Sequence, residues 1–195
     1  MSKRFEQKEL RKQLIIYKSL ELFVKKGYAE TKISDIAKEA NMSVGLLFHY
    51  FSSKEQLYEE LIKICVNGTN YSIQMNFSNP LEYFQTFIDL LFEYSKENPM
   101  VFYMFILMSQ ARRSDGIPRH IKELALSVNQ IEQSAKIIEQ GQKEGYFKEG
   151  DPHAISFIFW SSVQGIMEQL SASNELLLAD KIDTNWIIDI IRRNK

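Results

Sequence analysis

The stretch SVGLLFHYFSSKEQL, residues 43–57, decides the fold of this chain. The nine positions from Val44 to Ser52 hold five apolar residues, a histidine and a tyrosine. A single amphipathic helix buries one stripe of side chains, so four adjacent rings cannot all face the same core. We therefore expect some of these residues to be buried and the others to be exposed for another purpose.

Leu47 and Phe51 are the two residues expected inside, because they are four positions apart and share one face of a helix. Ser43 is the predicted N-cap of that helix. Asn41 is expected at a sharp turn before it, since asparagine tolerates a positive φ. The other faces of the helix then carry Val44, Gly45, Leu46, Phe48, His49 and Tyr50.

Helices are also predicted on both sides of this segment. Residues 10–26 form an amphipathic stripe that ends at Gly27. A short helix follows over residues 33–40, with Thr31 placed to cap it. Lys54 opens a later helix, because Ser53 and a glutamine three residues on resemble a capping box.

Two short helices joined by a tight turn and braced by a longer helix form a helix-turn-helix unit. In such a unit the second short helix lies in the DNA major groove. Gly45 would let the backbone approach DNA closely, while His49, Tyr50 and Lys54 could donate to phosphates. The same spacing also fits a three-helix bundle that binds no DNA, and the residues alone leave both interpretations open.

Composition favours an all-α, intracellular protein. The 195 residues are 45% hydrophobic, with only four Pro and eight Gly, and no strand-like alternation stands out. Cys65 is the sole cysteine, which fits a reducing cytoplasm. The N-terminus lacks the apolar core of a signal peptide, and the longest apolar run, residues 100–108, is too short to cross a bilayer. We expect a soluble cytoplasmic protein that does not contact membranes.

Charge is distributed unevenly along the chain, although the net charge is only −1. Residues 1–54 hold eleven Lys and Arg against six Asp and Glu, whereas the remainder holds thirteen against nineteen. A basic head on an acidic body is expected where one end of a protein meets a polyanion, although ordinary solvated faces produce the same split.

In the remaining two-thirds of the chain, the apolar spacing predicts further helices over residues 80–97, 100–113, 118–144 and 152–170, and a last one over 183–194. An enzyme is not indicated. The three histidines fall in different elements, without a carboxylate at metal-binding spacing, and no Gly-rich phosphate loop or nucleophile elbow occurs. Neither a metal nor a cofactor is expected, and Cys65 is predicted to be a packed thiol.

Residues 22–61, LFVKKGYAETKISDIAKEANMSVGLLFHYFSSKEQLYEEL, resemble the DNA-binding domain of the TetR family of bacterial regulators. The resemblance implies an all-α fold of about nine helices. Its DNA-binding domain would span residues 8–66, with a helix-turn-helix at about 33–51. Residues 67–195 would form a larger ligand-binding and dimerisation domain.

By position, the resemblance implies DNA contacts from Thr31, Lys32, Ser43, Val44, Gly45, Leu46, Phe48, His49, Tyr50 and Lys54. Phe48 departs from the family pattern, which most often has Tyr there, so a phosphate-binding hydroxyl is absent. The predicted recognition helix also lacks Arg, Asn and Gln, the residues that make bidentate base contacts. Base recognition would then depend on thymine methyl contacts from Val44 and Leu46 and on DNA shape.

The family also implies a small-molecule effector and a homodimer on a near-palindromic operator. Expected ligand residues are Phe84, Phe87, Tyr103, Met104, Met108, Trp160 and Gln164. Expected dimer residues are Phe157, Trp160, Ser161, Gln164, Met167, Trp186, Ile187 and Ile190. We expect a repressor released by a neutral or cationic lipophilic ligand. The alternatives are an activator of the same fold and a helical ligand-binding or scaffolding module that binds no DNA.

Overall fold

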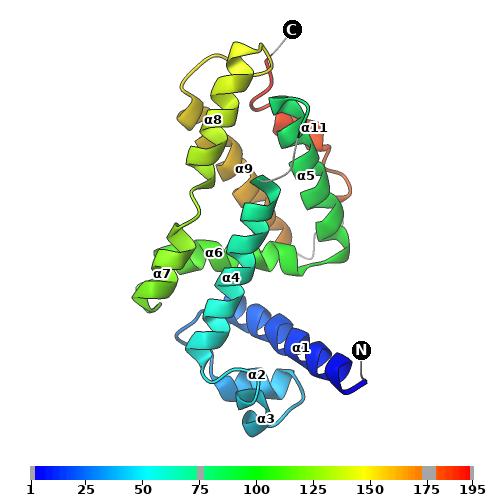
Figure 1. Ribbon diagram of the computed structural model, residues 1–195, viewed down its shortest axis with the longest axis vertical. Coiled ribbons are helices and arrows are strands. Elements are labelled where there is room, and N and C mark those ends of the chain that lie inside the picture. The colour runs from blue at the N-terminus through cyan, green and yellow to red at the C-terminus, as the bar shows by residue number, and fades with distance from the viewer. Residues whose placement is uncertain (1–2, 74–76, 173–178, 194–195) are drawn as a thin grey trace. The chain divides into compact units, whose positions relative to one another are not determined.

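The computed structural model describes residues 3–73, 77–172 and 179–193, which form two compact units (Figure 1). The first unit comprises Met1–Asn67 and Ile106–Ser127, and the second comprises Gly68–Phe105 and Val128–Lys195. Two helices therefore contribute residues to both units: α4 (Lys54–Ile73) and α6 (Met100–Arg113).

The described residues are helical apart from turns and one antiparallel bridge between Phe147 and Arg192, which confirms the predicted all-α class. The other helices are α1 (Lys3–Lys26), α2 (Ile33–Glu39), α3 (Val44–Phe48), α5 (Pro80–Glu97), α7 (Arg119–Leu126), α8 (Gln130–Lys143), α9 (Pro152–Ala172) and α11 (Thr184–Ile188). Among the helices in this part of the chain, none is long and apolar enough to span a membrane.

In the first unit, α2 and α3 are short helices joined by a tight turn, and α1 packs beside α2 (Figure 1). Asn41 lies in that turn with a φ of 52°, as predicted. The Ser43 hydroxyl accepts a hydrogen bond from the Leu46 N–H at 3.1 Å and caps α3. Leu47 and Phe51 are 0% and 3% exposed, which confirms that these two residues face the core.

The start of α4 also follows its predicted cap. The Gln56 N–H donates to the Ser53 hydroxyl at 3.0 Å. The Gln56 carboxamide oxygen accepts from the Ser52 N–H, one residue before the cap, so the reciprocal bond of a capping box is displaced by one position. Further along α4, Cys65 is buried, and burial raises the pKa of its thiol to about 12. This agrees with a packed thiol.

An aromatic core holds the second unit together. Phe84 of α5 contacts the rings of Tyr83, Phe147 and Phe159 edge to face, with ring centroids 5.0 to 5.5 Å apart. Trp160 continues this cluster by contacts with Phe159 and Phe87. Helix α9, which supplies Phe159 and Trp160, packs along α8, and α5 packs on both α8 and α11. The edge-to-face arrangement is one that aromatic rings prefer, because the positive edge of one ring meets the negative face of the other.

The helix predicted over residues 118–144 is wrong, because the structure has two helices there, α7 and α8. The Ser127 hydroxyl donates to the Leu124 carbonyl, and the Asn129 side chain accepts from the Glu132 N–H at 3.1 Å, which caps α8. Short polar side chains of this kind compete with helical hydrogen bonds and favour a break. The last helix is also shorter than predicted, since α11 ends at Ile188 and the chain continues to the bridge at Arg192.

Gly141 is the tightest glycine position in the second unit. A Cβ added there would overlap ring carbons of Phe147 and lie 3.1 Å from the Pro80 Cβ. We expect Gly141→Ala to lower the free energy of unfolding by about 1 to 3 kcal/mol, measured by urea denaturation. Gly68→Ala is the matched control, because nothing lies within 4 Å of its added Cβ. That change should raise stability by about 0.5 to 1 kcal/mol, since alanine favours a helix. Equal effects of the two changes would contradict this packing.

Candidate DNA-binding site

Helix α3 presents an apolar outward face. Val44 and Phe48 are 38% and 46% exposed, and their spacing of four places them on one side of the helix. Leu47 of the same helix is fully buried. Leu46, the other residue expected to contact thymine methyl groups, is less accessible because it is half-buried. The exposed pair on this helix is therefore Val44 and Phe48.

The backbone at the start of α3 is open. Gly45 is exposed, and no heavy atom lies within 4 Å of an added Cβ. His49 is exposed directly after the helix, and Tyr50 is half-buried. These residues leave the first turn of α3 accessible to a large partner.

Thr31 does not cap α2, so that prediction is wrong. Lys32 occupies the N-cap position, and no side chain makes the capping hydrogen bond. The Thr31 hydroxyl instead donates to the carbonyl oxygens of Gly27 at 2.7 Å and Leu22 at 3.3 Å. Because Thr31 is 0% exposed, it offers no surface to a phosphate. Its role is to close the C-terminal end of α1.

Lys54 is bonded to the same turn. Its ammonium donates to the carbonyl oxygens of Tyr28 at 2.8 Å and Ala29 at 3.3 Å. It also lies 4.4 Å from the centroid of the Tyr28 ring, in a cation–π contact. An ammonium has three donors, so one N–H remains for a phosphate. Tyr28 was missed by sequence reasoning, because nothing in its spacing indicates a contact with a residue on α4.

The segment Ile106–Ser127 contacts α1 and α4 within the first unit. The Gln110 amide donates to the Val24 carbonyl of α1 at 3.1 Å, and His120 of α7 lies 3.6 Å from the Glu55 carboxylate of α4. The domain predicted over residues 8–66 does not include this segment. A composition pattern could not reveal it, since the contact crosses about half of the chain.

The expected ligand residues lie mostly in the core of the second unit. Phe84 and Trp160 are buried, while Phe87, Tyr103, Met104 and Gln164 are half-buried. The Trp160 indole N–H donates to the Ser134 hydroxyl at 2.6 Å, and the Gln164 amide donates to the Phe105 carbonyl at 3.2 Å. Met108 is half-buried too, and it lies in the part of α6 that belongs to the first unit.

The expected dimer residues divide into two sets. Trp160, Met167 and Ile187 are buried within the protomer, so they do not belong to an exposed face. The reason is that α9 and α11 pack on each other and α9 packs on α8, which covers one side of each helix. Gln164 and Ile190 are half-buried, and Phe157, Ser161 and Trp186 are exposed. Sequence reasoning missed Ile158, which is 54% exposed beside Phe157.

A groove of about 710 Å³ runs along this exposed side of α9 and α11. Its lining residues are Ser161, Ser162, Gly165, Ile166, Gln169, Leu170, Lys181, Ile182 and Trp186. A second hollow of about 290 Å³ lies between α5 and the start of α11. None of the seven expected ligand residues lines either hollow.

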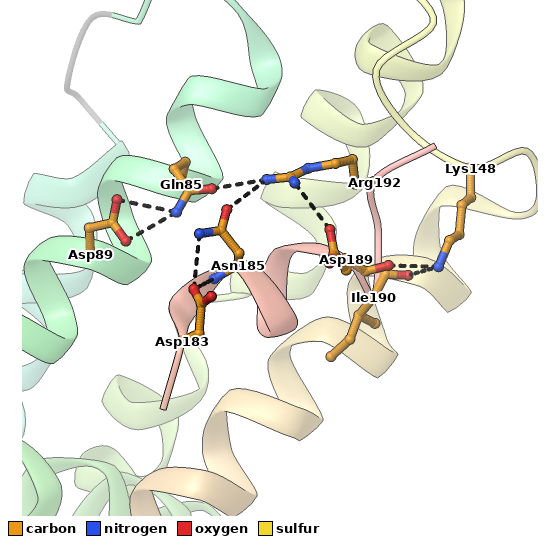
Figure 2. A network of polar contacts seen from close by, with 8 residues as sticks. All are labelled: Gln85, Asp89, Lys148, Asp183, Asn185, Asp189, Ile190 and Arg192. Carbon is orange, nitrogen blue, oxygen red and sulfur yellow. Dashed lines mark hydrogen bonds and ion pairs between the residues drawn. The ribbon is translucent and has the colours of Figure 1, made fainter. Parts of the chain in front are cut away.

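A polar network fixes α11 to α5, and Figure 2 shows it. The Arg192 guanidinium donates to the side-chain oxygens of Gln85 and Asn185, both at 3.2 Å, and pairs with the Asp189 carboxylate at 3.1 Å. Lys148 donates to the carbonyl oxygens of Asp189 and Ile190, at 2.7 and 3.1 Å. Because these bonds hold both ends of α11, Ile187 is kept buried and Trp186 is kept exposed.

Two buried hydroxyl groups of the first unit, those of Thr31 and Tyr58, lead to opposite predictions about stability. The Thr31 hydroxyl has two carbonyl partners, whereas the Tyr58 hydroxyl is buried without a hydrogen-bond partner among the described residues. We expect Thr31→Val to lower the free energy of unfolding by about 1 to 3 kcal/mol, because the carbonyls lose their donor. Tyr58→Phe should cause no loss, since it removes an unsatisfied group. Thermal unfolding of both variants tests this. Unchanged stability of Thr31→Val with weaker DNA binding would instead indicate a phosphate contact.

Family models match both parts of the chain. Residues 15–61 match the model described as bacterial regulatory proteins, tetR family. Residues 81–179, just over half of the chain, match the model described as tetracyclin repressor-like, C-terminal domain.

Curated relatives and solved structures agree with these models. The negative transcriptional regulator IcaR of the biofilm operon icaADBC, from Staphylococcus aureus (strain Newman), is 35% identical over 83 residues, which is 43% of this chain and 45% of that protein. The chain therefore spans less than half the length of this relative. The transcriptional regulator RutR of Escherichia coli O157:H7 is 25% identical over 94% of this chain and 87% of that protein.

Two solved structures share the fold at low sequence identity. A TetR-family regulator from Agrobacterium tumefaciens is 19% identical, with a TM-score of 0.74 over 95% of this chain and 99% of that one. The ketosteroid transcriptional regulator KstR2 of Mycobacterium tuberculosis is 20% identical, with a TM-score of 0.73 over 94% of this chain and 96% of that one. Together with the two family models, these likenesses lead to one conclusion: the chain belongs to the TetR family of bacterial transcriptional regulators.

Proposed function

We propose that this TetR-family regulator is a cytoplasmic repressor that binds a near-palindromic operator as a homodimer and is released by a small lipophilic ligand. Members of the family bind operator DNA, usually as dimers, and respond to small molecules. The negative regulator IcaR is a relative over its matched part. The two-fold symmetry of a homodimer suits two half-sites of one operator.

The observation that carries the proposal is the outward face of α3. Its first turn is exposed at Val44 and Gly45, while Leu47 anchors the helix in the core. This is how a recognition helix has to be held if it is to enter the major groove. The first unit also carries side chains that are exposed or half-buried and can donate to phosphates: Lys32, His49, Tyr50 and Lys54. Thr31 is left out of the proposed contact set because it is buried.

The exposed face of α9 and α11 supports the homodimer. Phe157, Ile158 and Trp186 are each more than half exposed, and the groove of about 710 Å³ includes Trp186 in its lining. Large apolar side chains gathered on one face are typical of protein–protein contacts. Gly165 adds to this, because it leaves nothing within 4 Å of its Cβ position and lets a partner helix approach closely.

The effector site is proposed at the edge of the aromatic cluster of the second unit, where the half-buried Phe87 packs against Trp160. The rings fill this region, so a ligand would enter by displacing Phe87 from its contact. Tyr103, Met104 and Gln164 are the other residues proposed for it. Aromatic and methionine side chains adapt to apolar ligands, and none of these residues carries a charge.

Lys32 provides a test of DNA binding. It is exposed on the first unit, so we expect Lys32→Ala to weaken binding to the DNA that flanks the gene of this protein. The slope of log K against log salt concentration should become shallower by about 0.9, the value for one lost phosphate contact. Fluorescence anisotropy at several salt concentrations measures both quantities.

Lys136→Ala is the matched control, because Lys136 is an exposed lysine on α8 of the second unit. It should leave the slope unchanged. Equal slopes for both variants would contradict the proposed role of Lys32. Absence of any salt-sensitive complex with the wild-type protein would contradict DNA binding at this locus. A reporter transcribed from the same DNA then decides between repression and activation.

Phe157 provides a test of the dimer. We expect Phe157→Lys to shift the protein from dimer to monomer at micromolar concentration in sedimentation velocity, because a buried charge at the interface lacks a partner. Leu90→Lys is the control, since Leu90 is similarly exposed but lies on α5. It should remain dimeric. A wild-type monomer at the same concentration would contradict the homodimer itself.

A further inference from the structure

The helix-turn-helix contains an unusual pair of exposed side chains. Within residues 33–51, all of which the structure describes, Val44 and Phe48 are the exposed large apolar residues. They lie on the same side of α3, one turn apart. Neither is required by the core, because Leu47 alone fills the buried side of this helix.

Hydrogen-bonding side chains are lacking along the same face. The helix has the sequence VGLLF, which has no side-chain donor or acceptor. Ser43, at its start, already accepts the Leu46 N–H with its hydroxyl oxygen. His49 lies beyond its end and adjoins Tyr50, where both can serve phosphates. A base edge that faces Val44 and Phe48 therefore meets hydrocarbon.

The major groove offers one matching apolar group. Guanine, cytosine and adenine present donors and acceptors there, whereas thymine adds its 5-methyl group. An aromatic ring placed on a donor or acceptor would leave that group without a partner, which is unfavourable. A ring placed on a methyl group removes apolar surface from water and is favourable.

We propose that Val44 and Phe48 form an apolar reading pair that selects thymine by its 5-methyl groups, with Phe48 as a specificity-determining residue. The proposal rests on the proposed DNA-binding function and states what each half-site must contain. Residues four apart on a helix are separated by about 6 Å along its axis. This distance is close to two base-pair steps of about 3.4 Å each. The two selected thymines therefore lie within about two steps of each other in each half-site.

Phe48, and not Leu46, completes the pair. Leu46 is half-buried, so part of its side chain is covered by the protein. Phe48 is 46% exposed, and its ring extends further from the helix than a leucine side chain. Phe48 has no hydroxyl group, so it cannot donate a hydrogen bond to phosphate. The same lack leaves an entirely apolar ring, which suits contact with a methyl group.

The experiment uses the full chain and a pool of random 30-base-pair duplexes. Bound duplexes are selected and sequenced, and the best one is resynthesised with deoxyuridine in place of one thymidine at a time. Uracil keeps every hydrogen-bonding group of thymine and lacks only the methyl group. We expect two positions per half-site at which uracil weakens binding about fourfold, as one buried methyl group of about 0.8 kcal/mol implies. Other thymines should tolerate the replacement.

Substitutions of Phe48 and Val44 show which side chain contacts each uracil-sensitive position. Phe48→Ala should abolish the uracil penalty at one of the two positions, and Val44→Ala should abolish it at the other. Phe48→Leu should retain the penalty, because leucine is still apolar. Leu126→Ala is the control, since Leu126 is an exposed leucine of the same unit that lies on α7, and it should retain both penalties.

The outcomes separate this inference from the function on which it rests. Failure to select any duplex from the pool would contradict DNA binding. Selection followed by equal affinity for thymine and uracil at every position would overturn the reading pair alone. A uracil penalty that persists unchanged in both Phe48→Ala and Val44→Ala would also overturn it.

Discussion

The burial of Leu47 is the constraint on which the DNA-binding surface depends. Helix α3 has five residues, far too few to be stable on its own. Its direction is fixed by one buried side chain and two local features: Leu47 is fully buried, Ser43 caps the first turn, and Asn41 reverses the chain with a φ of 52°. Leu47 holds α3 against the core, while Val44 and Phe48 of the same helix remain 38% and 46% exposed. The exposed pair therefore depends on the anchoring of the helix by Leu47 and on the absence, in the described part of the chain, of neighbouring elements over Val44 and Phe48.

A second constraint acts on the turn between α1 and α2. Thr31 and Lys54 both donate to carbonyl oxygens there, and the Lys54 ammonium also contacts the Tyr28 ring. The carbonyl groups of Gly27, Tyr28 and Ala29 follow the last residue of α1, and hydrogen bonds to them stabilise the turn. Thr31 lies just before α2 and Lys54 begins α4, and both donate to the turn that follows α1. Thr31 and Lys54, which the family resemblance associates with phosphate, therefore stabilise the unit that carries the proposed recognition helix.

Much of the fold could be predicted from periodicity and capping residues. The helices over residues 80–97 and 100–113 have the predicted limits, and the α3 core residues are buried as expected. The break at residues 127–129 was missed because the apolar spacing continues through it, with Ile121 and Ile138 both buried on either side. Periodicity reports which residues are apolar, and it does not report whether the backbone hydrogen bonds between them are continuous.

The candidate surfaces were harder to predict for a related reason. Helix α9 is apolar on more than one face, and its sequence cannot tell which face is covered by its own chain. The structure separates Trp160 and Met167, which are buried, from Phe157 and Ile158, which are exposed. Similarly, sequence reasoning paired Val44 with Leu46, and only the packing of Leu46 distinguishes it from Phe48. Each distinction requires knowledge of the neighbouring helices.

The two exposed apolar surfaces suit different partners because their surroundings differ. On α3 the pair is small, and the chain around it is basic, with eleven Lys and Arg against six acidic residues in the first 54 positions. A surface of this kind suits a polyanion that presents isolated methyl groups, since positive charge supplies affinity and the methyl groups supply selectivity. On α9 and α11 the set of exposed apolar side chains is larger and comprises Phe157, Ile158 and Trp186. These residues belong to the acidic remainder of the chain. Net negative charge there would disfavour DNA as a partner, and the apolar side chains agree with the proposal that a second copy of the chain covers this face.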